Sequence, residues 1–459
     1  MTLRRLSAAL ACGLLLCTLA ACDSSSGIGA DVGDDLRGGD PQAIDLVPDS
    51  SDYGPTDIAP PVTGNTQVSR AWRFLVGRVQ DPLAGTATAN GYFDLNPTGE
   101  ISTGVLNGDL SNLQAELSLD PQYVHGDSTA TVEFALFDLD DNPDFEDARA
   151  DATFPDSAQV EGTFSVSADA DTAVTIELPA SWLEDHLAQL QDTSDVDDRA
   201  RFRETFKGFR LAARSSVSAS DPGAVIGFSS RSSVLRLSRT DIDEAQTYTI
   251  SQSFTNITWS ETPAGTVPSD RILLRGGDTQ ALRAAFDFDQ VRTDTLIGAP
   301  LNRVRLDFPI DTTAAASLPP DFVRPRVQGY RLLMKRADDP DVPSCDGGEL
   351  GPLGPQTPAT GLDPQDEEGS ICFVPIDLSP LPGAVGSSGL FQVVDQSLEP
   401  NRPVVFEQFR VEILDRFSTE TSFSPARSGV PTTSPVLFYG PRAEASANRP
   451  VFSIIATPL

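Results

Sequence analysis

Apolar and polar positions alternate along most of this chain, as expected for strands that bury one face. In the first such run, Trp72, Phe74 and Val76 would face one way, and in a later run Val132, Phe134 and Leu136 do the same. Pro- and Gly-containing turns separate the runs, as between antiparallel strands. Further strands are predicted at 92–95, 113–119, 174–178, 209–211, 225–228, 234–237 and 248–259.

Helical periodicity is convincing at one place only. Ser181 is a good N-cap, and Glu184 three positions later completes a capping box. Leucines then recur on one face of the predicted helix, and a second helical turn or two is expected before Gly208. The leucines are Leu183, Leu187 and Leu190.

The second half of the chain echoes the first, in the same order and at an offset of about 190–200 residues. For example, Phe206-Lys207-Gly208-Phe209 is followed by Phe406-Glu407-Gln408-Phe409. Chance recurrence of similar strands is the alternative; we favour a tandem duplication of one β-sandwich unit. The other echoes are 285–288 after 92–95, 302–306 after 112–117, 330–339 after 134–141, 376–378 after 176–178, and 434–437 after 232–235.

The predicted fold class is therefore all-β, with two tandem antiparallel β-sandwich or jelly-roll domains and one or two short helices. The expected divisions are a signal peptide at 1–21, a flexible acidic tether at 22–65, and sandwiches at 66–262 and 263–459. The tether is expected because this stretch is rich in Gly, Asp, Ser and Pro and has no sustained periodicity.

The N-terminus has the form of an export signal. Arg4 and Arg5 precede an apolar run, which ends in Leu19-Ala20-Ala21-Cys22. This ending resembles the lipobox of bacterial lipoproteins, which implies acylation of Cys22 and anchoring to a membrane by lipid. An ordinary cleaved signal is the alternative. No other apolar run approaches the roughly 20 residues of a membrane-spanning helix.

The formal net charge of the 459-residue chain is −33, which makes nucleic acid an unsuitable partner. The only two lysines are Lys207 and Lys335, and all other basic residues are arginines. An acidic surface that avoids lysine suggests a halophilic protein, because roughly molar salt shortens the Debye length to about 3 Å. GC-rich coding would also explain the arginine bias.

Five cysteines are present, and three of them belong to the predicted signal and lipidation site. The remaining two, Cys345 and Cys372, flank a loop rich in Gly, Pro and acidic residues. An exported protein permits a disulfide between them, worth roughly 3–4 kcal/mol on the chain-entropy model. A metal-binding pair is the weaker alternative, since neither histidine is nearby.

Three short motifs stand out in the first half: Leu75-Val76-Gly77 followed by the turn Asp81-Pro82-x-x-Gly85, the run Tyr123-Val124-His125-Gly126-Asp127, and Phe206-Lys207-Gly208-Phe209. Together they resemble a family of uncharacterised surface lipoproteins of gram-negative bacteria. That family has no known function, so the resemblance implies a location and no reaction. The closing strands, around 417–420 and 435–439, are similar to those of cell-surface jelly-roll modules, which are carbohydrate-binding-like.

Catalytic motifs are scarce. A Ser-His-Asp hydrolase needs an imidazole, and only His125, expected in a turn, and His186, expected to be solvated on the helix, are available. The sequence has no nucleophile elbow, P-loop or dinucleotide fingerprint. A carboxylate pair could cleave a glycoside, but with 66 acidic residues such a pair carries little information.

One acidic loop has the ligand types of a calcium site. Carboxylate and amide oxygens stand at alternate positions, as Ca²⁺ prefers, although Pro143 and Arg149 depart from the helix–loop–helix pattern. A solvated acidic loop is the favoured alternative, and no other cofactor is expected. The candidate ligands are Asp138, Asp140, Asn142, Asp144 and Glu146.

The sequence thus predicts a non-catalytic protein that a lipid on Cys22 holds at the outer membrane, on the cell surface or the periplasmic face. Its expected partner is a glycan or an outer-membrane protein. The alternatives are a carbohydrate-active hydrolase with two carboxylates, and a purely structural surface protein. Trp72, Trp182 and Trp259 could stack on sugar rings, although strand tryptophans are more often core.

Overall fold

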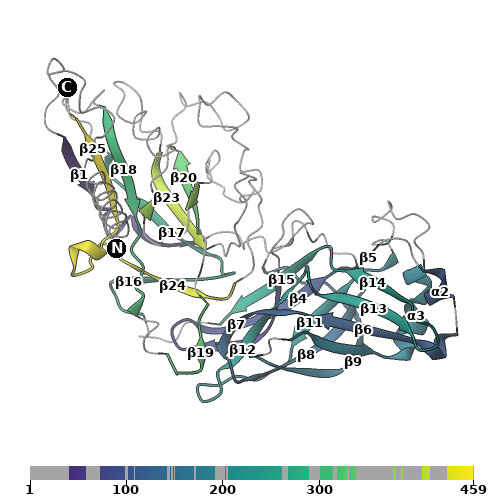
Figure 1. Ribbon diagram of the computed structural model, residues 1–459. Coiled ribbons are helices and arrows are strands. Elements are labelled where there is room, and N and C mark those ends of the chain that lie inside the picture. Colours follow the sequence, from purple (N-terminus) through teal and green to yellow (C-terminus); the bar gives the residue numbers. More distant parts are fainter. Residues whose placement is uncertain are drawn as a thin grey trace, which may run out of the picture.

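The protein is an all-β molecule built from antiparallel sheets, seen in a computed structural model (Figure 1). The strands fall into two units, here called the first unit (strands within 73–259) and the second unit (strands within 42–57 and 271–456). The predicted fold class is confirmed. The structure describes residues 41–57, 73–98, 102–107, 109–141, 145, 148, 150–169, 172–191, 202, 205–260, 267–288, 300–313, 318–325, 327, 330–336, 376–378, 384–385, 406–413 and 432–457.

The first unit consists of two sheets that face each other across one core. Phe74, Phe93 and Phe228 from the larger sheet meet Leu117 and Leu235 from the smaller one, and all five are fully buried. Each such side chain contributes about 1.5–3 kcal/mol when removed from water. The larger sheet contains β3 (Arg73–Asp81), β4 (Gly85–Phe93), β7 (Pro121–Asp127), β8 (Thr131–Leu139), β9 (Asp156–Ser167), β11 (Phe209–Ala213), β12 (Gly223–Ser229) and β15 (Ser253–Trp259). The smaller contains β5 (Asn96–Pro97), β6 (Leu113–Leu119), β10 (Val174–Leu178), β13 (Val234–Arg239) and β14 (Ala245–Thr249).

The helices described in this unit lie at one of its ends (Figure 1). Helix α3 (Ala180–Gln191) buries the predicted Leu183 and Leu190 together with Trp182, whereas the predicted Leu187 is partly buried; α2 (Thr103–Leu106) is a single turn. The helix begins two residues earlier than predicted, because the carbonyl of Pro179 accepts the first helical hydrogen bonds. Ser181 is therefore inside the first turn and is not the N-cap.

The second unit has a separate core around Leu282, Val304 and Phe452. One of its sheets has the order β1-β25-β18-β22, and another has the order β2-β17-β23-β20-β21. A two-stranded antiparallel sheet, β16 with β24, lies toward the first unit (Figure 1). The strands are β1 (Gln42–Leu46), β2 (Tyr53–Asp57), β16 (Arg271–Arg275), β17 (Gln280–Ala285), β18 (Leu301–Asp307), β20 (Tyr330–Arg336), β21 (Ile376–Leu378), β22 (Ala384–Val385), β23 (Phe406–Ile413), β24 (Pro435–Tyr439) and β25 (Val451–Ala456); β19 (Phe322–Val323) joins the first unit's larger sheet.

Residues 42–57 contradict the prediction of a tether that is flexible as far as residue 65. β1 pairs with β25 over five residues, and β2 pairs with β17 over five more. Ile44, Leu46 and Tyr53 supply the apolar contacts inside a stretch otherwise rich in Asp and Pro. Three apolar side chains in such a stretch give too weak a periodicity to be recognised from sequence.

The two units use the same strand order where the echoes are longest. Phe209 in β11 pairs with Phe93 and with Asp138, and Phe409 in β23 pairs in the same way with Ala284 and Met334. The echo between 206–209 and 406–409 therefore corresponds to equivalent positions in the two sheets. The echo between 134–141 and 330–339 also joins equivalent positions, since Asp138 pairs with Phe209 and Met334 pairs with Phe409.

Two other echoes do not correspond in space. Residues 435–437 of one echo lie in β24, which pairs with β16. The place of β13 beside β6 is taken in the second unit by β25 beside β18. Likewise β21 pairs with β20 as β9 pairs with β8, so residues 376–378 do not match β10. At these two places the echo reflects short apolar runs of similar composition and not equivalent positions in the two units.

The two units differ in the chain segment that adds one strand to each of two sheets. In the first unit β14 lies beside β13 and β15 beside β4, and both follow in the chain. In the second unit these two positions belong to β1 and β2, from the opposite end of the sequence. A backbone bond marks the equivalence: Asp94 N–H donates to the carbonyl of Gln252, and Ala285 N–H donates to that of Asp52. The first unit thus lies, in sequence, inside the second.

Candidate functional site

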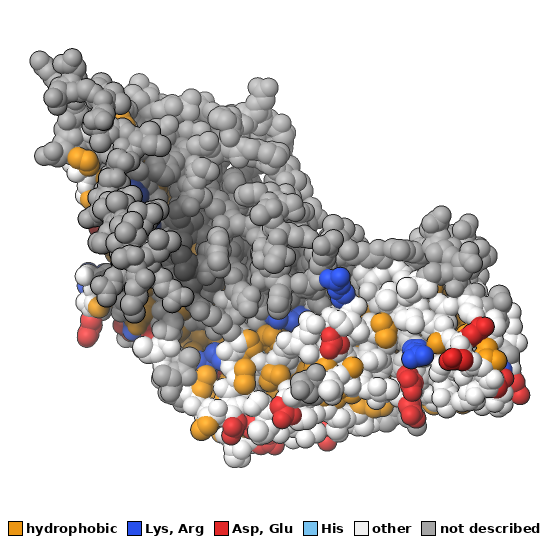
Figure 2. All heavy atoms as spheres, in the orientation of Figure 1, with side chains coloured by type: hydrophobic (Ala, Val, Ile, Leu, Met, Phe, Trp, Pro, Cys, Tyr) orange, Lys and Arg blue, Asp and Glu red, His pale blue; other side chains and the backbone are white. Residues whose placement is uncertain are grey.

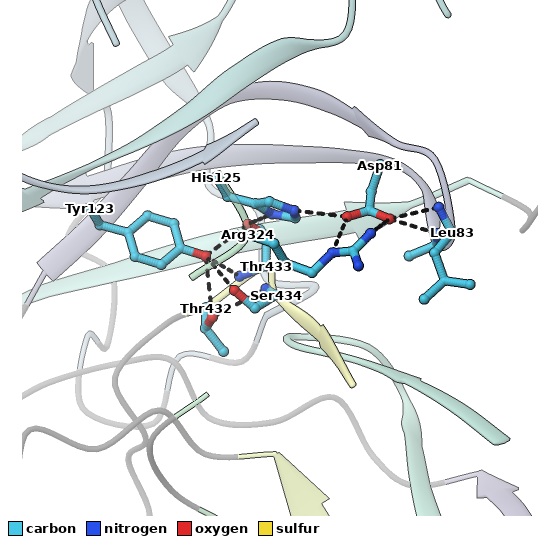
Figure 3. Close-up of polar contacts among 9 residues, drawn as sticks. Asp81, Leu83, Tyr123, His125, Arg324, Thr432, Thr433 and Ser434 are labelled. Carbon is cyan, nitrogen blue, oxygen red and sulfur yellow. Dashed lines mark hydrogen bonds and ion pairs between the residues drawn. The ribbon is translucent and has the colours of Figure 1, made fainter. Parts of the chain in front are cut away.

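The most concentrated polar cluster among the described residues lies where the two units meet (Figure 3). The first unit supplies Asp81 at the end of β3 and strand β7, while the second half of the chain supplies Arg324 and the segment 432–434. Strand β19 brings Arg324 into place, because Phe322 and Val323 extend the first unit's sheet beside β7.

Asp81 is a fully buried carboxylate that accepts five hydrogen bonds. The amides of Leu83 and Ala84 donate to Oδ1 over 2.8 and 3.0 Å, which closes the Asp-Pro-x-x-Gly turn. Arg324 donates from both Nε and Nη2, over 2.9 and 2.8 Å, in a bidentate fork. His125 Nε2 lies 3.1 Å from Oδ2. Every lone pair of this carboxylate therefore has a protein donor nearby.

Burial alone would raise the pKa of Asp81, since it disfavours the charged form. The hydrogen bonds and positive charges of His125 and Arg324 outweigh burial, and they hold the pKa of Asp81 well below its usual range. Asp81 is therefore an anion throughout the physiological pH range.

His125 links that anion to the second unit. An ionised carboxylate only accepts hydrogen bonds, so Nε2 carries a proton and donates to Asp81. Nδ1 lies 2.8 Å from the hydroxyl of Thr433. The imidazole also meets Phe322 edge-on, with ring centroids 5.9 Å apart. His125 is fully buried within β7, not in a turn as the sequence suggested.

Tyr123, two residues earlier on the same strand, binds the same segment of the second unit. Its hydroxyl lies 3.2 Å from the hydroxyls of Thr432, Thr433 and Ser434, and it accepts from the amide of Thr433. The guanidinium of Arg73 lies 4.1 Å from the centre of the Tyr123 ring. Alternate residues of β7 thus point at one loop of the second unit.

Thr433, His125 and Asp81 lie in the order of a nucleophile–base–acid relay, but their surroundings do not suit catalysis. All three side chains are fully buried, so no substrate atom can approach the hydroxyl. The imidazole is also turned round: Nε2 faces the carboxylate and Nδ1 the hydroxyl, the reverse of a serine hydrolase. The arrangement joins two units through satisfied polar groups.

The other histidine is held in a second cluster at α3. His186 stacks on Trp182, with centroids 4.6 Å apart, and its Nδ1 donates to the Trp182 carbonyl over 2.8 Å. Trp182 Nε1 donates to Asp138 over 2.9 Å, and His186 Nε2 lies 3.5 Å from the same carboxylate. Burial raises the pKa of Asp138 despite these two partners. His186 is partly exposed, but its ring is held by Trp182 and Asp138 and is not freely solvated as the sequence suggested.

The candidate calcium ligands fall only partly within the described residues. Asp138 is turned toward Trp182 and His186, and Asp140 is exposed. Asn142, Asp144 and Glu146 lie outside the described residues, as do Cys22, Cys345 and Cys372. In the part of the chain that the structure describes, no three His, Cys, Asp or Glu side chains are placed to hold a metal ion.

The tryptophans are engaged in structural contacts where the structure describes them. Trp182 is buried, and partly buried Trp259 donates from Nε1 to the Gly276 carbonyl over 2.9 Å. Trp72 lies outside the described residues.

The junction residues other than His125 were not singled out as a site from sequence. Asp81 and Tyr123 did stand in motifs that carry the lipoprotein resemblance, so a signal existed for the first-unit side. Arg324 and 432–434 are separated from Asp81 by more than 240 residues in sequence, and nothing local marks them as its partners.

Comparison with known proteins identifies no family. No protein-family model matches the sequence, and no curated protein matches it significantly. Among solved structures, one similar chain is a protein of Parabacteroides distasonis that is thought to be secreted, at 9% identity and a TM-score of 0.17 over 91% of this chain and 98% of that one. None of the described helices is long and apolar enough to cross a membrane.

Proposed function

We propose that this is a non-catalytic, lipid-anchored protein of the bacterial outer membrane that presents a binding surface to a glycan or to an outer-membrane protein. The lipid is attached to Cys22, behind the predicted signal peptide. The two sandwiches act together as one support, and the buried junction keeps them in a fixed relation.

The observation that carries the non-catalytic part is the placement of the histidines. The chain has two. His125 is sealed between Asp81 and Thr433, and His186 is held between Trp182 and Asp138. The His125 imidazole is closed off from any substrate, and that of His186 stacks on Trp182 beside a carboxylate with no described serine or threonine hydroxyl bonded to it, which disfavours hydrolysis of the serine–histidine kind.

The charge of the surface favours a neutral or cationic partner over an anionic one. Acidic side chains are spread over the face of the first unit in Figure 2, among apolar groups and a few basic ones. With a net charge of −33, the chain repels anionic polymers at low salt.

Binding can be tested with the purified protein on an array of neutral and charged glycans, with a pull-down from outer-membrane extracts alongside. Retention of a glycan class or of one membrane protein supports the proposal. Failure in both, under dilute and molar salt, would leave the purely structural role.

The second candidate function is glycoside hydrolysis by a carboxylate pair. Release of reducing sugar from a retained glycan would establish it, and loss of that release on replacing one Asp or Glu would identify the pair.

Anchoring is tested separately by detergent phase partition of the cell-expressed protein. The wild-type chain should enter the detergent phase, and Cys22→Ser should move to the aqueous phase. Equal partition of both would reject lipidation at Cys22.

A further inference from the structure

The second unit holds residues 42–57, here called the N-terminal arm, in a slot between two open strand edges. β1 occupies the outer edge of β25, and β2 occupies the outer edge of β17. Within the part of the chain that the structure describes, β1 and β2 are edge strands that each pair on one side. The arm therefore adds one strand to each of two sheets, as a peptide does in β-augmentation.

The slot recognises the arm by more than backbone pairing. Leu46 and Tyr53 are buried in the core of the second unit, and the Tyr53 ring stacks on Phe308 at 6.5 Å. Two arginines bind the turn between β1 and β2. Arg283 donates to the carbonyl of Ser51, and Arg442 donates to the hydroxyl of Ser50, each over 2.8 Å.

The arm reaches the rest of the second unit only through the whole first unit. In the first unit the equivalent strands β14 and β15 follow β13 directly in the chain. Residues 58–72 connect the arm to β3, and the first unit then separates it from β16. The path of the chain alone therefore does not fix whether an arm pairs with the second unit of its own chain or with that of another copy.

We propose that the N-terminal arm is an exchangeable element, and that the slot of the second unit accepts the arm of a second copy of this chain. The same contacts form within a chain and between chains, because donor and acceptor sequences are identical. The balance between the two is then set by protein concentration: an arm joined to its own chain by a short connection has an effective concentration of roughly the millimolar range, and crowded copies compete with it.

A pair of opposed residues provides the test. Asp45 and Ser453 face each other across β1 and β25, and Ser453 Oγ donates to Asp45 over 2.6 Å. Opposed strand positions have the Cα separation that a disulfide needs. One tagged full-length chain carries Asp45→Cys, and a differently tagged chain carries Ser453→Cys. The two are mixed, warmed to release the arms, and oxidised at several protein concentrations.

Exchange predicts a disulfide-linked species that carries both tags and rises with protein concentration. The matched control pairs Asp45→Cys with Glu177→Cys, an exposed residue of β10 in the first unit, and reports random collision and any reaction of the native cysteines. A single chain with both Asp45→Cys and Ser453→Cys should close within itself, which verifies the docking. Mixed-tag species no more abundant than the control at the highest concentration, or failure of the double variant to close, would overturn the proposal. The assay does not depend on the lipid or on a ligand, so its result is separate from the proposed function.

Discussion

At the scale of single residues, the junction depends on one buried charge. Asp81 accepts five hydrogen bonds, two of them from its own turn and three from His125 and Arg324. The turn bonds need only an acceptor oxygen, whereas the bonds to His125 and Arg324 gain from the negative charge. Replacement by asparagine separates these two roles.

We expect Asp81→Asn to destabilise the protein by about 3–5 kcal/mol at neutral pH, because it leaves Arg324 buried beside a neutral group. The native pKa of Asp81 lies below its ordinary value, so the ionised carboxylate stabilises the fold above about pH 4. That stabilisation is lost as the pH falls through the native pKa. The difference between wild type and variant should therefore narrow in acid, as measured by urea unfolding at neutral pH and near pH 3.

The matched control is Asp241→Asn, which also removes a carboxylate bonded to an arginine, Arg239. Because Asp241 is exposed, its replacement should change stability little at either pH. An Asp81→Asn deficit that persists unchanged at pH 3 would mean that the charge is not what the junction uses.

Gly126 allows β7 to pass close to β12, next to His125. Its φ is +123°, and a Cβ there would lie 2.3 Å from the carbonyl oxygen of Gly223. Gly126→Ala should cost more than about 2 kcal/mol through strain and overlap. Gly54→Ala, on β2, is the control, since nothing lies within 4 Å of its added Cβ. Thermal unfolding of both variants checks this; equal melting temperatures would contradict it.

At the scale of elements, sequence periodicity located most strands of the first unit, since a sheet with one buried face alternates apolar and polar residues. Val132, Phe134 and Leu136 are fully buried in β8, as expected. The echo of Phe209 by Phe409 also has a physical basis, because both mark the strand that pairs with β4 or its counterpart β17.

The partners of the second unit could not be predicted from sequence in this way. Period-two alternation says that a segment is a strand, but it does not say which edge that strand joins. Leu46 and Tyr53 pack against residues more than 200 positions away, in a stretch whose composition is that of a linker. The junction was missed for the same reason, since Asp81 and Arg324 meet only after both units have folded.

The arm also fits its slot imperfectly. The Tyr53 hydroxyl is buried and has no hydrogen-bond partner among the described residues, whereas the Tyr248 hydroxyl of β14 donates to the Leu190 carbonyl over 3.0 Å. Tyr53→Phe should therefore stabilise the protein, by up to about 1–3 kcal/mol, and Tyr248→Phe should destabilise it by about 1 kcal/mol. Chemical unfolding of the two variants measures both signs, and destabilisation by Tyr53→Phe would show that its hydroxyl is bonded after all.

At the scale of the whole molecule, the net charge of −33 opposes compactness through self-repulsion. We expect the melting temperature to rise by several degrees between dilute buffer and molar sodium chloride, because salt screens exposed charges and leaves the buried Asp81 pairs less affected. Calorimetry in the two buffers checks this, and an unchanged melting temperature would count against a salt-rich habitat.

The junction should also make the two units unfold together. Units of one chain usually move independently unless their interface is strong. Here Tyr123 and buried His125 bond to 432–434 of the second unit, and the bidentate pair of Arg324 with Asp81 fastens the segment of the second half that follows β19 onto the first unit. Wild type should show a single calorimetric transition. Arg324→Gln removes the fork to Asp81 and should split it into two, with one unit melting earlier. Arg303→Gln, an exposed arginine of β18, should keep the single transition. Two transitions in wild type, or one in Arg324→Gln, would mean that the coupling does not run through Asp81 and Arg324.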